Sequence, residues 1–369
     1  VRAGGAPIAA AAVLAFFAVL LFGVGPAWLV AYRNPAAPLR LDSRGGGVSR
    51  QRRRLRQLLV ASQVSLALIM LTGAGLLTRS LVRLETLNLG YRTDHLIVLQ
   101  LVLDLGKLKT NAELWPLYDK IAPHVRAVPG VTSMTPVELP PFFGPNVFTA
   151  PWEVEGQSVA QTDANPFVPI ESGGPEYFRT LGIPIVRGRG FVDGDREDAP
   201  RVAVVSQSVA RMFWPGQDPI GKRLRFRGDT VWRTVVGIAG DIHYRVLREA
   251  TPSVFLPFRQ FFWQGGFVLR TPLTVSAILP SLKRAVSQGD PDANVWDART
   301  MDDMLAIPLA EPRLSTLVLS MFGFVALVLA AVGLYGVMAS AVREQTRDIG
   351  VRMALGATPQ RVRGEVLQR

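Results

Sequence analysis

The chain has 369 residues, of which 49% are hydrophobic, and its mean hydropathy of +0.23 is high for a water-soluble protein. Its apolar residues concentrate in three stretches without any charge, at 3–32, 57–78 and 314–342. Crossing a bilayer takes about 20 helical residues, and each stretch is long enough. The composition therefore excludes an ordinary soluble protein and predicts three membrane-spanning helices, with the second weakened by several polar side chains.

The first stretch is too long for the apolar part of a signal peptide, and an arginine-rich segment follows it. The net charge of +12 comes mainly from two regions beside the apolar stretches, 33–56 and 343–369. Short loops rich in Lys and Arg stay in the cytoplasm. We therefore expect 33–56 and 343–369 to be cytoplasmic and 85–312 to lie outside. Nucleic-acid binding by the arginines at 50–56 is the less favoured alternative, so we expect no nucleic-acid partner.

The outer segment 85–312 has a mixed pattern of strands and helices. Apolar, β-branched runs predict strands, and apolar residues with helical spacing predict helices. Strands are expected at 96–103, 202–205, 235–238 and 267–269, and helices at 114–128, 207–213 and 275–286. The stretch 136–169 is rich in Pro, Gly and Asn and predicts a long excursion. Alternating strands and helices favour layered α/β packing, and without any cysteine the domain must be stable without disulfides.

A helical pattern follows the third apolar stretch. Val342, Thr346, Ile349 and Met353 share one face, and Asp348 with Arg352 forms a favourable i,i+4 pair. A glycine at 356 and a Thr-Pro pair at 358–359 predict a corner and a new helix. The pattern fits either a helix that lies on anionic lipid headgroups or a docking helix for a cytoplasmic partner. On the pattern alone, the helix on the lipid surface is slightly favoured.

We find no pattern typical of an enzyme, a cofactor site or a metal site. The segment 216–222 fits the first seven places of a phosphate-binding loop, but Arg223 stands where a Ser or Thr hydroxyl is needed, and Pro219 removes an amide donor. The acidic residues at 193–198 lack the spacing of a calcium loop. The three histidines are far apart, and a G-x-S-x-G elbow is missing.

Several motifs resemble those of one family. The segment 343–357 (REQTRDIGVRMALGA) and the preceding 333–338 (GLYGVM) are similar to the cytoplasmic signature of MacB-like and FtsX-like ABC transporter permeases. The motifs 128–131 (VPGV), 177–183 (YFRTLGI), 204–206 (VVS) and 215–222 (PGQDPIGK) are similar to the periplasmic core domain of MacB-like permeases. Asp348 stands where the family usually has Glu, with the charge kept. The resemblance covers about residue 58 to the end.

The resemblance implies an α-helical transmembrane protein with a large extracytoplasmic α/β (α+β) domain of the MacB periplasmic core type. Residues 1–32 followed by the basic linker 33–57 resemble the end of a preceding permease unit, as in the acidobacterial duplicated orphan permeases. A second unit then comprises a span at 58–84, the core domain at 85–312 with an inserted second part at about 136–230, a span at 313–342, and 343–369. On this interpretation the chain is a fragment that lacks the last two spans.

The resemblance also implies a function. The chain would be a non-enzymatic permease subunit in the bacterial cytoplasmic (inner) membrane, driven by a separate cytoplasmic ATPase, for export or extraction of a substrate. A second permease unit or a periplasmic adaptor is a further possible partner. The helix at 343–355 would contact the ATPase, through Arg343, Glu344, Arg347, Asp348, Ile349, Arg352 and Met353. The alternative is a signalling or regulatory membrane protein whose outer domain senses a ligand or activates an envelope enzyme.

Overall fold

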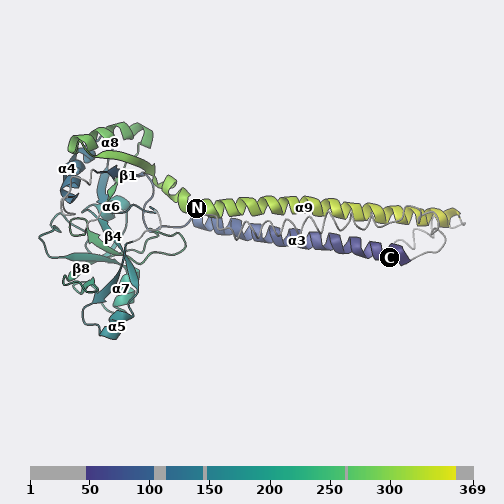
Figure 1. Ribbon diagram of the computed structural model, residues 1–369, viewed down its shortest axis with the longest axis horizontal. Coiled ribbons are helices and arrows are strands. Elements are labelled where there is room, and N and C mark those ends of the chain that lie inside the picture. The colour runs from purple at the N-terminus through teal and green to yellow at the C-terminus, as the bar shows by residue number, and fades with distance from the viewer. Residues whose placement is uncertain (1–46, 104–113, 144–147, 262–264, 355–369) are drawn as a thin grey trace. The chain divides into compact units, whose positions relative to one another are not determined.

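The computed structural model describes residues 47–103, 114–143, 148–261 and 265–354 (Figure 1). The apolar stretch expected at 3–32 lies outside these residues, as do most of the linker and the corner expected at 356–359. The chain forms two compact units. One comprises 1–69 with 324–369, and the other comprises 70–323.

Two long helices, α3 (Gly47–Glu85) and α9 (Met301–Ala354), contain the second and third apolar stretches. The helical segments Gln57–Glu85 and Met301–Ala339 are strongly apolar, and most of their residues are not buried. Both are therefore long and apolar enough to cross a membrane, with most side chains facing outward. In the first unit the helices approach closely, because a Cβ atom on Gly333 would lie 2.8 Å from Oε1 of Gln63.

Helix α9 differs from the prediction at both ends. We expected a helix that begins after Pro312, but α9 begins at Met301 and contains Pro308 and Pro312. The start is fixed by reciprocal hydrogen bonds: the Asp303 amide donates to Oγ1 of Thr300 (3.2 Å), and the Thr300 amide donates to Oδ2 of Asp303 (3.1 Å). Such a capping box stabilises a helix start. The helix also continues without a break from 342 to Ala354, so the expected separate short helix is part of α9.

The first lobe of the larger unit is an antiparallel sheet in the order β11-β1-β10-β2. Two helices that contact each other, α4 and α8, pack against one face (Figure 1). In chain order this is a β-α-β, β-α-β arrangement of the ferredoxin-like kind. The strands expected at 96–103 and 267–269 are confirmed, and so are the helices expected at 114–128 and 275–286. The elements are β1 (Leu96–Val102), α4 (Leu114–Arg126), β2 (Ser133–Val137), β10 (Gly266–Arg270), α8 (Val275–Gly289) and β11 (Asn294–Thr300).

The second lobe is inserted between β2 and β10 and is a closed barrel. Its strands pair in the ring β4-β3-β7-β8-β6-β9, which closes because β9 also pairs with β4. Closure leaves the ring without a free edge. The strands are β3 (Thr149–Val154), β4 (Phe167–Gly173), β6 (Val202–Ser206), β7 (Arg223–Phe226), β8 (Arg233–Ala239) and β9 (Val254–Pro257). The short strand β5 (Ile185–Gly188) also pairs with β8, at residues 237–239, beyond the residues that pair with β7.

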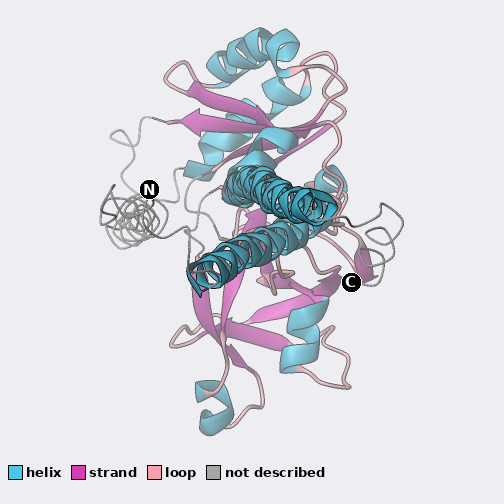
Figure 2. Ribbon diagram, turned by 90° about the vertical axis from the view of Figure 1, so that its right-hand side faces the viewer, coloured by secondary structure: helices cyan, strands magenta, loops and turns pink. Residues whose placement is uncertain are grey.

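The barrel is filled by apolar side chains, among them Trp152, which is fully buried. Its indole Nε1 donates to the Val168 carbonyl at 3.3 Å, so the single polar atom of the ring is satisfied. The stretch 136–169, expected as an excursion, in fact contains β3, the short helix α5 (Val159–Asp163) and the start of β4. Figure 2 shows the strands of the two lobes in magenta. Two further short helices are α6 (Tyr177–Leu181) and α7 (Gln207–Phe213), the latter as predicted.

Candidate functional site

The residues expected to contact an ATPase all lie in the last part of α9. The helix expected at 343–355 is confirmed as far as Ala354. The side chains of its proposed contact lie outside the described residues, so their roles stay predictions: Arg343, Glu344, Arg347, Asp348, Ile349, Arg352 and Met353. The other end of α9 is embedded in the larger unit.

At that junction both long helices are anchored in one hydrophobic core. Met301 and Met304 of α9 are each 1% exposed and belong to a cluster with residues of β1, α6 and β9. Leu81 and Leu84 of α3 pack against the same cluster. An ion pair between Arg313 and Glu85, at 2.8 Å, joins the two helices just beyond it. The ends of both helices are therefore packed into the core of the larger unit. The sequence signal for this anchor was the pair Thr300 and Asp303, three residues apart.

A buried ionic cluster lies next to this junction. Arg245 donates to both carboxylate oxygens of Glu171, at 3.0 Å from Nε and 2.5 Å from Nη2, and also to the Pro140 carbonyl at 3.0 Å. The Arg245 and Glu171 side chains are 4% and 2% exposed. Arg245 also lines a surface groove between Leu81 of α3 and Pro312 of α9. The cluster thus ties β4 of the barrel to the loop beside the two helices.

A second carboxyl group, that of Glu138, lies near this pair and has no cation of its own. Its side chain is buried, and its Oε2 atom has no hydrogen-bond partner. Burial raises the pKa of Glu138 to about 8, with a further contribution from the charge of Glu171. Burial also raises the pKa of Glu171 to about 7, although Arg245 opposes that shift. One arginine faces two buried carboxyl groups, so Glu138 holds a proton at neutral pH.

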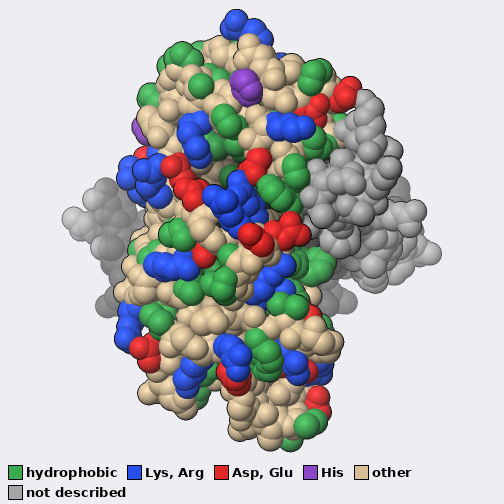
Figure 3. Space-filling model, turned by 90° about the vertical axis from the view of Figure 1, so that its left-hand side faces the viewer, with side chains coloured by type: hydrophobic (Ala, Val, Ile, Leu, Met, Phe, Trp, Pro, Cys, Tyr) green, Lys and Arg blue, Asp and Glu red, His purple; other side chains and the backbone are tan. Residues whose placement is uncertain are grey.

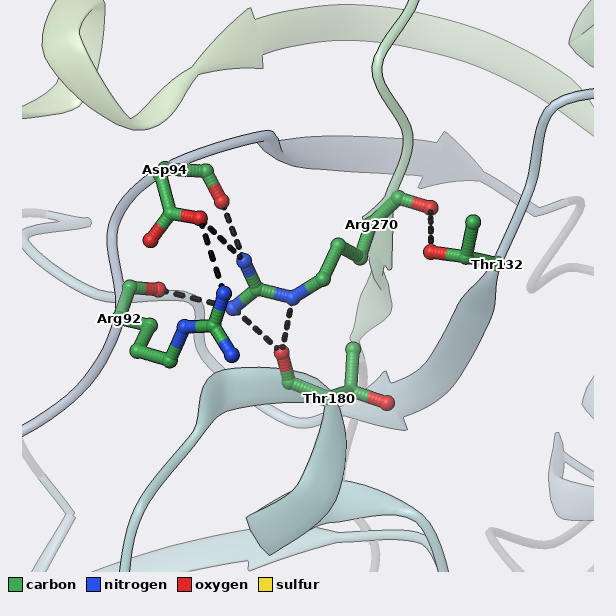
Figure 4. Close-up of polar contacts among 5 residues, drawn as sticks. All are labelled: Arg92, Asp94, Thr132, Thr180 and Arg270. Atoms are coloured by element: carbon green, nitrogen blue, oxygen red, sulfur yellow. Dashed lines mark hydrogen bonds and ion pairs between the residues drawn. The ribbon is translucent and has the colours of Figure 1, made fainter.

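A third polar cluster joins the first lobe to helix α6 (Figure 4). The Arg270 guanidinium, on β10, donates to the carbonyl of Thr180 at 3.1 and 2.9 Å, to the carbonyl of Arg92 at 3.0 Å and to the carbonyl of Asp94. Arg92 and Asp94 also form an ion pair at 3.3 Å. Arg270 also pairs with Oδ2 of Asp94 at 3.4 Å. Since its other acceptors are backbone carbonyls, the cluster positions the chain ahead of β1.

The segment 216–222 is a turn between α7 and β7. Three amides that a phosphate would need are already used: those of Ile220, Gly221 and Lys222 donate to Asp218, Val235 and Pro219, at 3.1, 2.8 and 3.0 Å. The extended segment expected after the turn is β7, whereas a phosphate-binding loop leads into a helix. The geometry explains why the glycine-rich spacing occurs without a nucleotide site.

We therefore expect full-length chain, purified in detergent without any ATPase, to bind no ATP at micromolar concentration. The Lys222→Ala variant should behave identically, because the Lys222 side chain donates to Gln217 on the surface of the turn. Equilibrium binding of a fluorescent ATP analogue with magnesium measures this. Binding by the wild type that disappears in Lys222→Ala would show that the turn can rearrange around a phosphate.

Two of the four acidic residues at 193–198 have hydrogen-bond partners within the domain. Asp195 accepts two hydrogen bonds from Arg189, at 2.8 and 2.9 Å, and one from the Val192 amide. Glu197 accepts from the indole of Trp115 at 3.1 Å. Among the described residues no group of three or more His, Asp or Glu side chains could hold a metal ion. On the face in Figure 3, basic and acidic side chains are interspersed, unlike the single-sign surface typical of nucleic-acid binding.

Comparison with known proteins identifies related sequences. Residues 64–288 match the family described as MacB-like periplasmic core domain. The macrolide export ATP-binding/permease protein MacB of Hahella chejuensis is 28% identical over 202 residues, which cover 52% of this chain and 30% of that protein. The probable syringafactin export ATP-binding/permease protein SyfD of Pseudomonas syringae pv. tomato is 26% identical over 208 residues, with the same coverage of both chains.

The match thus spans about a third of the length of these relatives. Among solved structures, the periplasmic region of MacB from Actinobacillus actinomycetemcomitans aligns with a TM-score of 0.40 and 14% identity, over 58% of this chain and 92% of that one. The family match covers more than half of the chain. The chain therefore belongs to the MacB-like periplasmic core domain family.

Proposed function

We propose that this chain is the permease subunit of an ABC-type exporter and transmits movement between a separate cytoplasmic ATPase and its outer domain. On this proposal, α3 and α9 span the bacterial cytoplasmic membrane, 85–312 lies outside, and the arginine-rich segments lie in the cytoplasm. Residues 1–32 would add a span that closes a preceding permease unit, as in the acidobacterial duplicated permeases.

The observation that carries the proposal is the continuity of α9. A single helix contains both Met301, which is buried in the domain core, and the segment 343–353 that resembles a coupling helix. At about 1.5 Å per residue its 54 residues extend for roughly 80 Å, far more than the 30 Å of a hydrocarbon core. A helix that continues through residue 342 could transmit a displacement along the chain from 343–353 to the domain core.

Export is the direction that the relatives favour, because their names describe export of macrolides and of syringafactin. In the proposed cycle, ATP-driven closure of the ATPase moves the end of α9. The anchored core at Met301 and Met304 then moves the outer domain. No substrate needs to pass between the spanning helices, since the work is done on the outer side.

Two substitutions in the proposed coupling segment test this function. Asp348→Lys removes the pairing with Arg352 and places a like charge beside it, and Ile349→Asp removes an apolar anchor of the kind used in helix-in-groove docking. We expect both to abolish copurification of ATP-hydrolysing activity with the tagged full-length chain from its native membrane. Gln345→Lys also introduces a lysine, but at a position outside the proposed contact, and should retain the activity.

The lipid-surface interpretation of the same segment predicts the opposite sign. An added Lys should strengthen adhesion to anionic lipid by about 1 kcal/mol, while Ile349→Asp should weaken it. If both variants keep full ATPase association, the coupling assignment is wrong. Membrane insertion and the unfolding midpoint of the outer domain should be unchanged in all three variants, which separates loss of docking from loss of fold.

A further inference from the structure

An apolar concavity of about 670 Å³ lies beside the first turns of α9. Three large side chains on it are exposed to solvent, which we call the apolar rim: Trp296 of β11 (70% exposed), Ile307 of α9 (51%) and Phe143 (37%). Its floor includes the buried side chains of Phe142 and Met304. A tryptophan ring left mostly in water beside two other apolar side chains is unusual for a surface that faces only solvent.

The rim continues an apolar stripe on α9. Leu314 and Met321 follow Ile307 at intervals of seven residues, which is close to two helical turns, and they are 62% and 61% exposed. Positions seven apart lie on nearly the same face. The stripe therefore runs from the rim into the uncharged stretch that begins at Leu314.

The distance along α9 identifies what the rim meets. Ile307 lies seven residues before Leu314, or roughly 10 Å along the helix axis. The headgroup region of one leaflet is about 5 to 8 Å thick. If the uncharged stretch occupies the hydrocarbon core, the rim lies at the outer boundary of the headgroups. Tryptophan is enriched at that depth, because its ring is apolar and its N–H group can contact water.

The polar groups around the rim suit an uncharged contact. Asp297 and Arg299 both line the concavity and pair with each other at 2.5 Å. The rim therefore presents no excess charge with which it could select anionic lipids or an oppositely charged peptide. Attraction to the boundary would come from burial of the three apolar side chains.

We propose that the rim of Phe143, Trp296 and Ile307 inserts into the headgroup boundary of the outer leaflet and so sets the height of the outer domain above the membrane. The inference rests on the proposed membrane-spanning function. It identifies a lipid surface as the partner of this part of the domain, in addition to any ATPase in the cytoplasm.

Single-cysteine labelling tests this without removal of any native cysteine, since the chain has none. An environment-sensitive fluorophore is attached to Trp296→Cys, and separately to Ile307→Cys, in full-length chain reconstituted in phosphatidylcholine vesicles. Nitroxide groups on the lipid headgroups should quench both labels. Val159→Cys on the barrel lobe, 79% exposed in the wild type, is the matched control and should keep its emission. The second rim position provides the test if Trp296→Cys fails to fold.

Met321→Cys tests the membrane-spanning position of α9 separately from the insertion of the apolar rim. Its label should be quenched by nitroxides on the acyl chains, and failure there would refute the spanning helices themselves. Quenching at 321 without quenching at 296 or 307 would overturn the rim proposal alone. A rim label that is shielded equally in detergent, in a concentration-dependent way, would identify a second protein copy as the occupant and also overturn it. Addition of phosphatidylglycerol should leave the quenching unchanged, and stronger quenching would contradict a neutral contact.

Discussion

Replacement of Arg245 by methionine is expected to destabilise the outer domain by about 3 to 5 kcal/mol, because it leaves the carboxylate of Glu171 buried and unpaired. The two oxygen atoms of Glu171 and the Pro140 carbonyl lose their donor together. The measurement is urea unfolding of the full-length chain in detergent, followed by tryptophan fluorescence.

A surface ion pair provides the matched control. Arg187 pairs with Asp218 at 2.8 Å, but the two side chains are 58% and 47% exposed. Arg187→Met should therefore cost no more than about 1 kcal/mol. The double variant Arg245→Met/Glu171→Leu should recover much of the loss, since an apolar pair can replace a buried ion pair at little cost. Equal unfolding midpoints for Arg245→Met and Arg187→Met would contradict this account.

The second large effect concerns pH. The pKa of Glu138 is about 8 in the fold and about 4.5 in an unfolded chain. The folded state therefore binds this proton more tightly. The stabilisation from proton binding at Glu138 is complete below about pH 4.5, decreases as the pH rises, and is lost above about pH 8. Glu138→Gln cannot ionise. At pH 9 we therefore expect its free energy of unfolding to exceed that of the wild type by on the order of 4 kcal/mol.

Unfolding curves of both proteins at a series of pH values measure this difference. The charged groups that face Glu138 are Glu171 on β4 and Arg245 in the loop after β8. The wild type and Glu138→Gln both retain these two groups. Glu249→Gln removes an exposed carboxylate instead, and its difference from the wild type should be small at every pH. Parallel curves for wild type and Glu138→Gln would show that Glu138 is ionised in the fold and stabilised by a group other than Arg245.

The local elements were largely predictable from the sequence. The strand predicted at 202–205 and the helix predicted at 114–128 correspond to β6 and α4, because each is specified by its own residues. Closure of the barrel was not predictable. It depends on the pairing of Ile170 with Val254, and neither strand contains a signal for its distant partner. Pro151 within β3 likewise made that strand look like a loop.

Of the candidate site, too, only the part specified by neighbouring residues could be predicted from the sequence. The coupling segment was predicted from a resemblance and a helical period, both of which are local. The anchor of α9 was missed because Pro312 suggested that the helix begins after it, although the capping pair at Thr300 and Asp303 was visible. The Arg245–Glu171 pair joins residues that are 74 positions apart, so only the fold brings them together.

The insertion of a closed barrel into a split sheet also determines the order in which the domain can fold. Val137 of β2 pairs with Gly266 of β10, and the whole barrel lies between them in the chain. During synthesis the barrel strands emerge first and can close on one another, whereas β2 must wait for β10. Closing such a long loop early would be slow and entropically costly. We expect the barrel to fold first and to bring the two strands together, so that the first lobe forms last.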